Sequence, residues 1–168
     1  MSLDALWTGV EQIPIAREIR ATGQLFPWIE SVHVLAICTV VGSIGIMDLR
    51  LLGVGHMQTP FSQVQRRLFP WQMFAMVFSS ATGLALVWGN PLNYVANIIF
   101  WVKMLAMAVA GLNALAFHFI TEYTLVDWDS GQTPPSAAKL AGWLSIFLWA
   151  NVILSGRLIP YAITWFRS

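Results

Sequence analysis

Long apolar stretches that contain almost no charge are the feature that most constrains how this chain can fold. Residues 68–102 contain no Asp, Glu, Lys or Arg. Across the whole chain 57% of residues are hydrophobic and only 10% are charged, whereas soluble domains carry about 25% charge. In the hydrocarbon of a bilayer every backbone amide must be hydrogen-bonded within the protein, so apolar stretches of this kind are expected to be helices. The sequence therefore predicts an all-α integral membrane protein.

Turn signals and polar clusters divide the apolar sequence into four predicted spans. A bilayer core takes about 20 helical residues. The predicted spans are residues 28–52, 68–88, 96–120 and 138–165. The connections between them are short, as at the turn signal Gly89-Asn90-Pro91, so consecutive spans should be antiparallel neighbours. We expect an up-down four-helix bundle, residues 27–168, with both termini on one side of the membrane.

Residues 1–26 have a different pattern. Apolar residues recur at helical spacing with charged residues between them, which is typical of an amphipathic helix. Anchored by Trp7, this segment is expected to lie in the membrane interface. The alternative is a short helix that covers the end of the bundle through protein contacts. Pro14 is expected to kink or break it.

Composition and motifs exclude several classes of protein. A net charge of +1 argues against nucleic acid as a partner, because nucleic acid requires a basic patch. Cys38 is the single cysteine, so no intramolecular disulfide can form. No catalytic triad, glycine-rich phosphate loop or zinc-ligand spacing is present.

Four ionisable residues are expected to share one layer inside the membrane. His33 and Lys103 each lie about 9 Å inside the start of their spans, the first and the third, which run in the same direction. Glu30 lies one helical turn before His33 on the same face. Arg157 reaches the same depth from the opposite direction, near the end of the fourth span. Ionisable residues at such depths are costly and usually mark a functional site.

The residue types in this layer predict a haem site. His33 is the expected axial ligand, because neutral imidazole commonly binds haem iron; the alternative is a hydrogen bond to a neighbouring helix. Lys103 is the expected second ligand as a neutral amine, with snorkelling to the headgroups or pairing with Glu30 as alternatives. Arg157 is expected to bind a haem propionate, a quinone oxygen or Glu30, and snorkelling is again the alternative.

A second polar layer is expected about 22 Å from the first, because Asp48 and His118 each lie 15 residues beyond the first-layer residue of the same span. His118 is thus too far away to share one metal with the first-layer histidine. It is expected to pair with Asp48 or His56, to serve the structure alone, or to mark a second cofactor site. Asn113 and Asn151 lie mid-span and are expected to hydrogen-bond between helices.

Several motifs resemble a known group of haem-binding membrane domains. They are Trp28-Ile-Glu-Ser-Val-His33-Val, Leu49-Arg50-Leu51 shortly before His56, Arg66-Arg67-Leu68, and Lys103 early in the third span. This set resembles the four-helix bacterial membrane protoporphyrinogen oxidases and the related copper-resistance D-type membrane domains. The resemblance implies that His33 and Lys103 are ligands of haem b. The acidic Asn-Glu motif expected before the last helix is absent, so the resemblance favours the haem site more than the oxidase reaction.

A closer resemblance is to an uncharacterised family of the bacterial inner membrane. Its members share the histidine of the first helix and three further motifs. These are Asp-Leu-Arg-Leu-Leu-Gly at residues 48–53, Gly-Leu-Asn-Ala-Leu-Ala-Phe-His at residues 111–118, and Gly156-Arg157-Leu158. This resemblance implies a multi-pass protein of the bacterial cytoplasmic membrane and implies no function.

We therefore expect a b-type haem protein of the bacterial inner membrane that transfers electrons. Its expected partners are the lipid bilayer, a quinone, and a membrane redox subunit or a second copy of the chain. Whether it catalyses a reaction is left open. One alternative is a membrane enzyme that oxidises a porphyrinogen. Another is a cofactor-free scaffold or transport subunit of a larger membrane complex.

Overall fold

The described part of the chain is helical, with short connections between the helices. In a computed structural model the described residues are Pro14, 23–54, 59–121, 128–129 and 133–165. Their helices are α3 (Leu25–Leu51), α4 (Phe61–Gly89), α5 (Pro91–Val95), α6 (Ile98–Thr121) and α8 (Ser136–Trp165). Four of them, all except α5, are long and apolar enough to cross a membrane. The prediction of a helical multi-pass membrane protein is thus confirmed at this level, whereas most of residues 1–26 lie outside the described residues.

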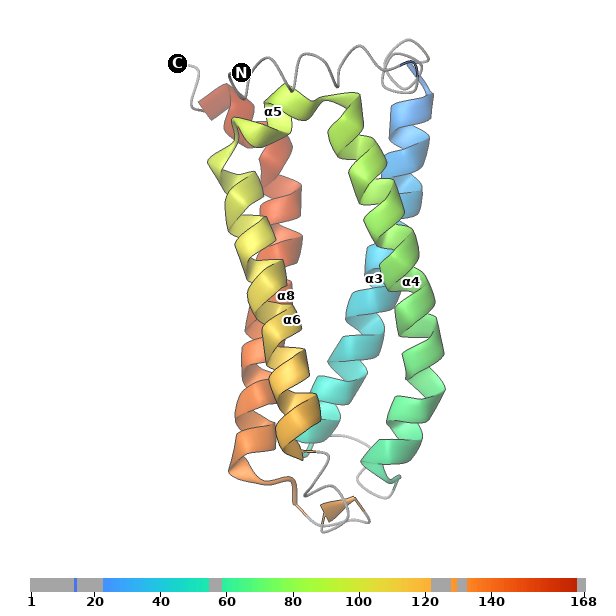
Figure 1. Ribbon diagram of the computed structural model, residues 1–168, viewed down its shortest axis with the longest axis vertical. Coiled ribbons are helices and arrows are strands. Elements are labelled where there is room, and N and C mark those ends of the chain that lie inside the picture. Colours follow the sequence, from blue (N-terminus) through green and yellow to red (C-terminus); the bar gives the residue numbers. More distant parts are fainter. Residues whose placement is uncertain (1–13, 15–22, 55–58, 122–127, 130–132, 166–168) are drawn as a thin grey trace.

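The four long helices are arranged as two hairpins (Figure 1). Helix α3 packs along α4, and α6 packs along α8. The hairpins meet mainly where α3 contacts α8, and the short helix α5 links the end of α4 to the start of α6. Successive long helices run in opposite directions in this view.

Helix α4 begins at Phe61, seven residues before the predicted start of the second span at residue 68. The connector is therefore much shorter than the predicted one, residues 53–67, and Arg66 and Arg67 belong to the helix. Pro60, at the N-cap, has no backbone N–H and sits where a helix leaves such a group unbonded anyway. The prediction placed the start too late because it counted only apolar residues, whereas a helix can continue through the headgroup region on polar residues.

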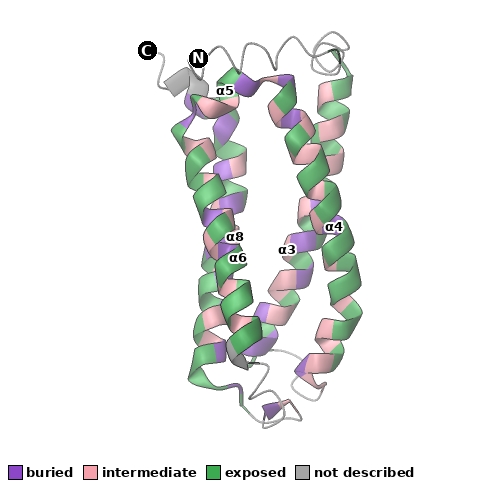
Figure 2. Cartoon of the chain, viewed as in Figure 1, coloured by how far each residue is buried: buried purple, intermediate pink, exposed green. Residues whose placement is uncertain are grey.

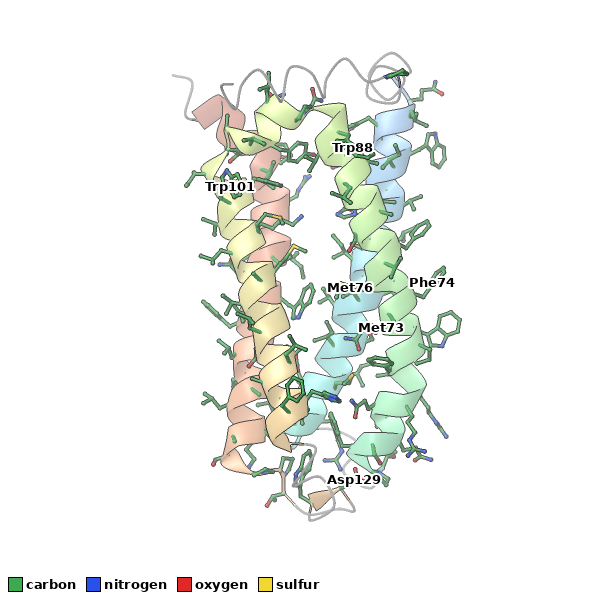
Figure 3. All side chains as sticks on the ribbon, viewed as in Figure 1. Met73, Phe74, Met76, Trp88, Trp101 and Asp129 are labelled. Atoms are coloured by element: carbon green, nitrogen blue, oxygen red, sulfur yellow. The ribbon has the colours of Figure 1, made fainter. Side chains whose placement is uncertain are left out.

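The first turn of α4 is held by a segment from the other hairpin. Asp129 accepts two hydrogen bonds from Ser62, through Oδ1 from the backbone N–H (2.9 Å) and through Oδ2 from the hydroxyl (2.5 Å). Phe61 beside it is almost fully buried and contacts the rings of Phe117 and Trp128, with centroids 5.8 and 5.7 Å away. Asp129 lies at the end of the molecule opposite to α5 (Figure 3). These contacts close that end of the molecule.

Asn97 organises the α5 end. Its side-chain oxygen accepts the backbone N–H of Ile99 (3.0 Å), and its amide donates to the carbonyl of Ile159 in α8 (2.9 Å). The residue therefore caps the start of α6 and ties it to α8. Trp88 and Trp101 lie near this same end in Figure 3, as residues of an interfacial aromatic belt do.

Helices α6 and α8 pack through small and branched residues. Ala106 and Ala110 are buried against Leu148 and Val152, and such small side chains let membrane helices approach closely. Asn113 donates to the carbonyl of Ala141 in α8 (3.0 Å), which confirms its predicted interhelical role.

Asn151 differs from its prediction. Its side-chain oxygen accepts a hydrogen bond from the Ser155 hydroxyl, one turn along the same helix (3.2 Å). Both residues belong to α8, so this hydrogen bond does not join two helices.

The outer surface is apolar. Exposed residues cover the outward faces of the helices, and buried ones gather where helices face each other (Figure 2). Phe74, which is 68% exposed, points away from the rest of the molecule in Figure 3. Large apolar side chains exposed in such numbers are expected where lipid replaces water as the solvent.

The contact between Asp129 and Ser62 predicts a measurable loss of stability. Asp129→Ala should lower the free energy of unfolding in detergent by about 1–2 kcal/mol, because it removes a charge-assisted helix cap. Ser62→Ala should lower the free energy of unfolding less in the Asp129→Ala variant than in the wild type, because the carboxylate that Ser62 contacts is already absent. Ser136→Ala, at the start of α8, is the control. Fully additive losses for the two substitutions would contradict the contact.

Candidate functional site

His33 forms a hydrogen bond from α3 to α4. Its Nδ1 lies 2.9 Å from Oγ1 of Thr82. The Thr82 hydroxyl also lies within hydrogen-bonding distance of the backbone carbonyls of Phe78 (2.8 Å) and Ser79 (3.1 Å) in its own helix. When the hydroxyl donates to one of these carbonyls, it accepts a hydrogen bond from the imidazole. In that arrangement Nδ1 carries the proton and Nε2 carries the lone pair.

The imidazole of His33 lies against a bare stretch of the α4 backbone. A Cβ added at Gly83 would come within 3.0 Å of the His33 Cε1 and 3.8 Å of its Nε2. Any side chain at this position would push the ring away. Thr82 and Gly83 thus set the position of the His33 ring together. Sequence reasoning weighed a hydrogen bond against metal ligation, and this geometry makes the two compatible, because the bond uses only Nδ1.

Lys103 occupies the equivalent place in the other hairpin. It is partly buried, and a Cβ added at Gly156 of α8 would lie 3.4 Å from its Nζ. The side chain therefore crosses from α6 to α8. Within the described part of the chain, the Lys103 amine forms no hydrogen bond or ion pair.

His33 and Lys103 are close enough to interact electrostatically. They belong to different hairpins, since His33 lies on α3 and Lys103 on α6. One group lies on each hairpin, and the charge of Lys103 reaches His33 across the space between them.

Glu30 and Arg157 do not contact this pair. Glu30 is exposed, and its charge instead raises the pKa of Tyr94 in α5. Arg157 is exposed too, and its guanidinium lies over the ring of Tyr161, 5.5 Å from the centroid. The buried residues of α8 form a stripe at helical spacing (Leu148, Val152, Ser155 and Ile159), and Arg157 lies on the opposite face. Arg157 lies at the depth of the layer of His33 and Lys103, but its side chain points away from them.

The second predicted layer does not form a pair. Asp48 is buried at the contact between α3 and α8, close to the Ser145 side chain, and its Oδ2 has no hydrogen-bond partner. His118 is exposed and contacts the ring of Phe119, with centroids 5.7 Å apart. His56, its other expected partner, lies outside the described residues.

Three residues of the site were missed by sequence reasoning: Thr82, Gly83 and Gly156. The available signal was the run of small residues at positions 79–83 and the small pair beside Arg157. Small residues mark close approaches between membrane helices. They do not reveal which side chain of the neighbouring helix fills the space.

Gly83→Ala should displace the His33 ring, because the new methyl group would overlap it. The substitution should lower the free energy of unfolding by about 1–3 kcal/mol. It should also change the ¹⁵N NMR shifts of the imidazole, which in the parent protein should show a protonated Nδ1 and an unprotonated Nε2. Gly111→Ala is the control, since no atom lies within 4 Å of its added Cβ. Unchanged His33 shifts in Gly83→Ala would contradict the packing.

Tyr94 should titrate abnormally. Burial raises the pKa of its hydroxyl, and the Glu30 charge raises it further. Since the folded protein keeps this proton at a pH where the unfolded chain has lost it, the free energy of unfolding should fall as the pH rises above about 10.

Ultraviolet absorbance of tyrosinate should show Tyr94 ionising above its ordinary pH. Tyr94→Phe should remove that phase. Glu30→Gln should move it only part of the way back, because burial is the larger cause. If Glu30→Gln left the pKa of Tyr94 unchanged, the Glu30 carboxylate would lie too far from Tyr94 to affect it.

Comparison with known proteins finds one match. The model of a family of unknown function (DUF6644) matches residues 19–162. This agrees with the expected membership of an uncharacterised family and carries no link to the haem-binding membrane domains. No curated protein and no solved structure matches the chain.

Proposed function

We propose that this chain, which belongs to the DUF6644 family, is a b-type haem membrane protein that transfers electrons. In this proposal His33 and Lys103 would hold the iron of the haem. A haem bound there would supply one-electron oxidation and reduction.

The observation that carries the proposal is the state of His33. Its Nδ1 is hydrogen-bonded to Thr82, and when the Thr82 hydroxyl donates to its own helix backbone, Nδ1 is the donor and Nε2 keeps a lone pair. Metal-binding histidines are typically held this way, with the second ring nitrogen donating to a fixed acceptor. The hydrogen bond thus supports ligation as well as structure.

The donor set of His33 and Lys103 fits a haem better than a bare metal ion. Among the described residues no three His, Cys, Asp or Glu side chains gather, whereas a structural zinc site needs four protein ligands. A haem needs protein ligands only along one axis. His33 and Lys103 supply two nitrogen donors, one from each hairpin. Lys103 can bind iron only as the neutral amine, so ligation competes with its protonation.

The proposal places the protein in the bacterial inner membrane as an up-down four-helix bundle. Residues 1–26 lie in the membrane interface as an amphipathic helix. A quinone, or a redox subunit docked against the helices, exchanges electrons with the haem. Arg157 is left out of the site because it faces away from it.

The test is the absorption spectrum of the detergent-purified protein, produced with ample haem, in the oxidised and dithionite-reduced states. The wild type should show a Soret band and sharp reduced α and β bands. His33→Ala should lose them. Lys103→Ala should retain haem with shifted bands, because the iron keeps one ligand and loses the other. Added quinol should reduce the oxidised protein.

His118→Ala is the matched control and should leave the spectrum unchanged, because this histidine lies 15 residues along α6 from Lys103, about 22 Å away. A colourless wild type would overturn the proposal and favour a cofactor-free subunit of a larger complex. Haem bands that survive in His33→Ala would place the haem elsewhere.

A further inference from the structure

A groove lies on the outside of the first hairpin, at the end opposite to α5. Its volume is about 410 Å³, within the range of small-molecule sites. It is formed by the last turns of α3, the residues on either side of the connector, and the first turns of α4. Among its lining residues are Ile46, Leu49, Val64 and Leu68, together with Arg50 and Arg67. We call it the α3–α4 groove.

The charge of the groove is positive. Among the described residues that line it, the two ionisable ones are arginines and none is an acid. Arg67 is exposed and makes no hydrogen bond or ion pair with any described residue. Arg50 is almost fully buried, and its Nε and Nη2 both donate to the carbonyl of Thr59 (3.2 and 3.1 Å). One guanidinium is therefore fixed in the wall, and the other is available to a ligand.

The depth of the groove matches the boundary between headgroups and hydrocarbon. Arg67 lies six residues into α4, about 9 Å from its start. Leu49 and Arg50 lie in the last turn of α3. Apolar side chains on the membrane side and guanidinium groups near the helix ends form a surface that is half apolar and half cationic.

We propose that the α3–α4 groove binds an anionic phospholipid. Its phosphate would lie at Arg67, where a guanidinium can donate two parallel hydrogen bonds, and the adjoining chain would cover Leu49 and Ile46. A zwitterionic lipid binds less well, because its ammonium group finds no acid in the lining. A free anion leaves the apolar lining uncovered.

The experiment titrates the full-length protein in detergent with phosphatidylglycerol or phosphatidylcholine of identical chains, with bound lipid counted by native mass spectrometry. The wild type should bind phosphatidylglycerol about tenfold more tightly, and Arg67→Gln should lose about that factor. Arg66→Gln removes the same charge from the adjacent exposed position, which does not line the groove, and should retain tight binding.

A second pair of variants tests the apolar part. Val64→Trp should narrow the groove and weaken phosphatidylglycerol binding with both arginines in place. Val77→Trp is its control, since Val77 is exposed on the same helix away from the groove.

Three results would overturn the proposal. Equal losses in Arg66→Gln and Arg67→Gln would indicate general attraction to basic residues rather than a site. Displacement of phosphatidylglycerol by millimolar inorganic phosphate would indicate a free-anion site. Equal binding of the two lipids would remove the charge argument.

Discussion

The arrangement of this protein depends on one constraint: a polar side chain inside a membrane is costly unless it has a partner on a neighbouring helix or on its own backbone. His33 bonds Thr82 across α3 and α4, and Asn113 bonds the backbone of Ala141 across α6 and α8. Apolar contacts with lipid and with protein are nearly equivalent, so hydrophobic burial alone selects no register between helices. These bonds, together with the close approaches at glycine, set the rotation of each helix against its partner.

The same constraint explains the difference between the two polar layers. In the first layer, His33 has a partner for one ring nitrogen and Lys103 lies against bare backbone. In the second layer, Asp48 is buried at the contact between α3 and α8 with an unpartnered oxygen, while His118 is exposed. Two residues at one depth on different helices meet only if both helices turn them inward.

The depth of a residue in the membrane could be predicted from the sequence, whereas the direction of its side chain could be predicted only in part. Counting residues along the spans placed His33 and Lys103 in one layer, because the rise of a helix is constant. The outward direction of Arg157 was not readable, because the stripe of buried residues on α8 is known only from the packed helices. The contacts of His33 with Thr82 and Gly83 were not readable, because they depend on how α4 is rotated against α3. The start of α4 was misplaced because polarity marks the edge of the hydrocarbon and not the end of a helix.

The division into two hairpins also has a consequence for the order of assembly. Within each hairpin the contacting residues are closer in sequence than those that join α3 to α8, so less chain entropy is lost when they meet. The junction of α3 with α8 joins helices at opposite ends of the described chain. During synthesis α3 and α4 can pair while α8 has not yet been made. The surface of α3 that carries Asp48 therefore stays exposed to lipid, water or the insertion machinery until α8 has been synthesised.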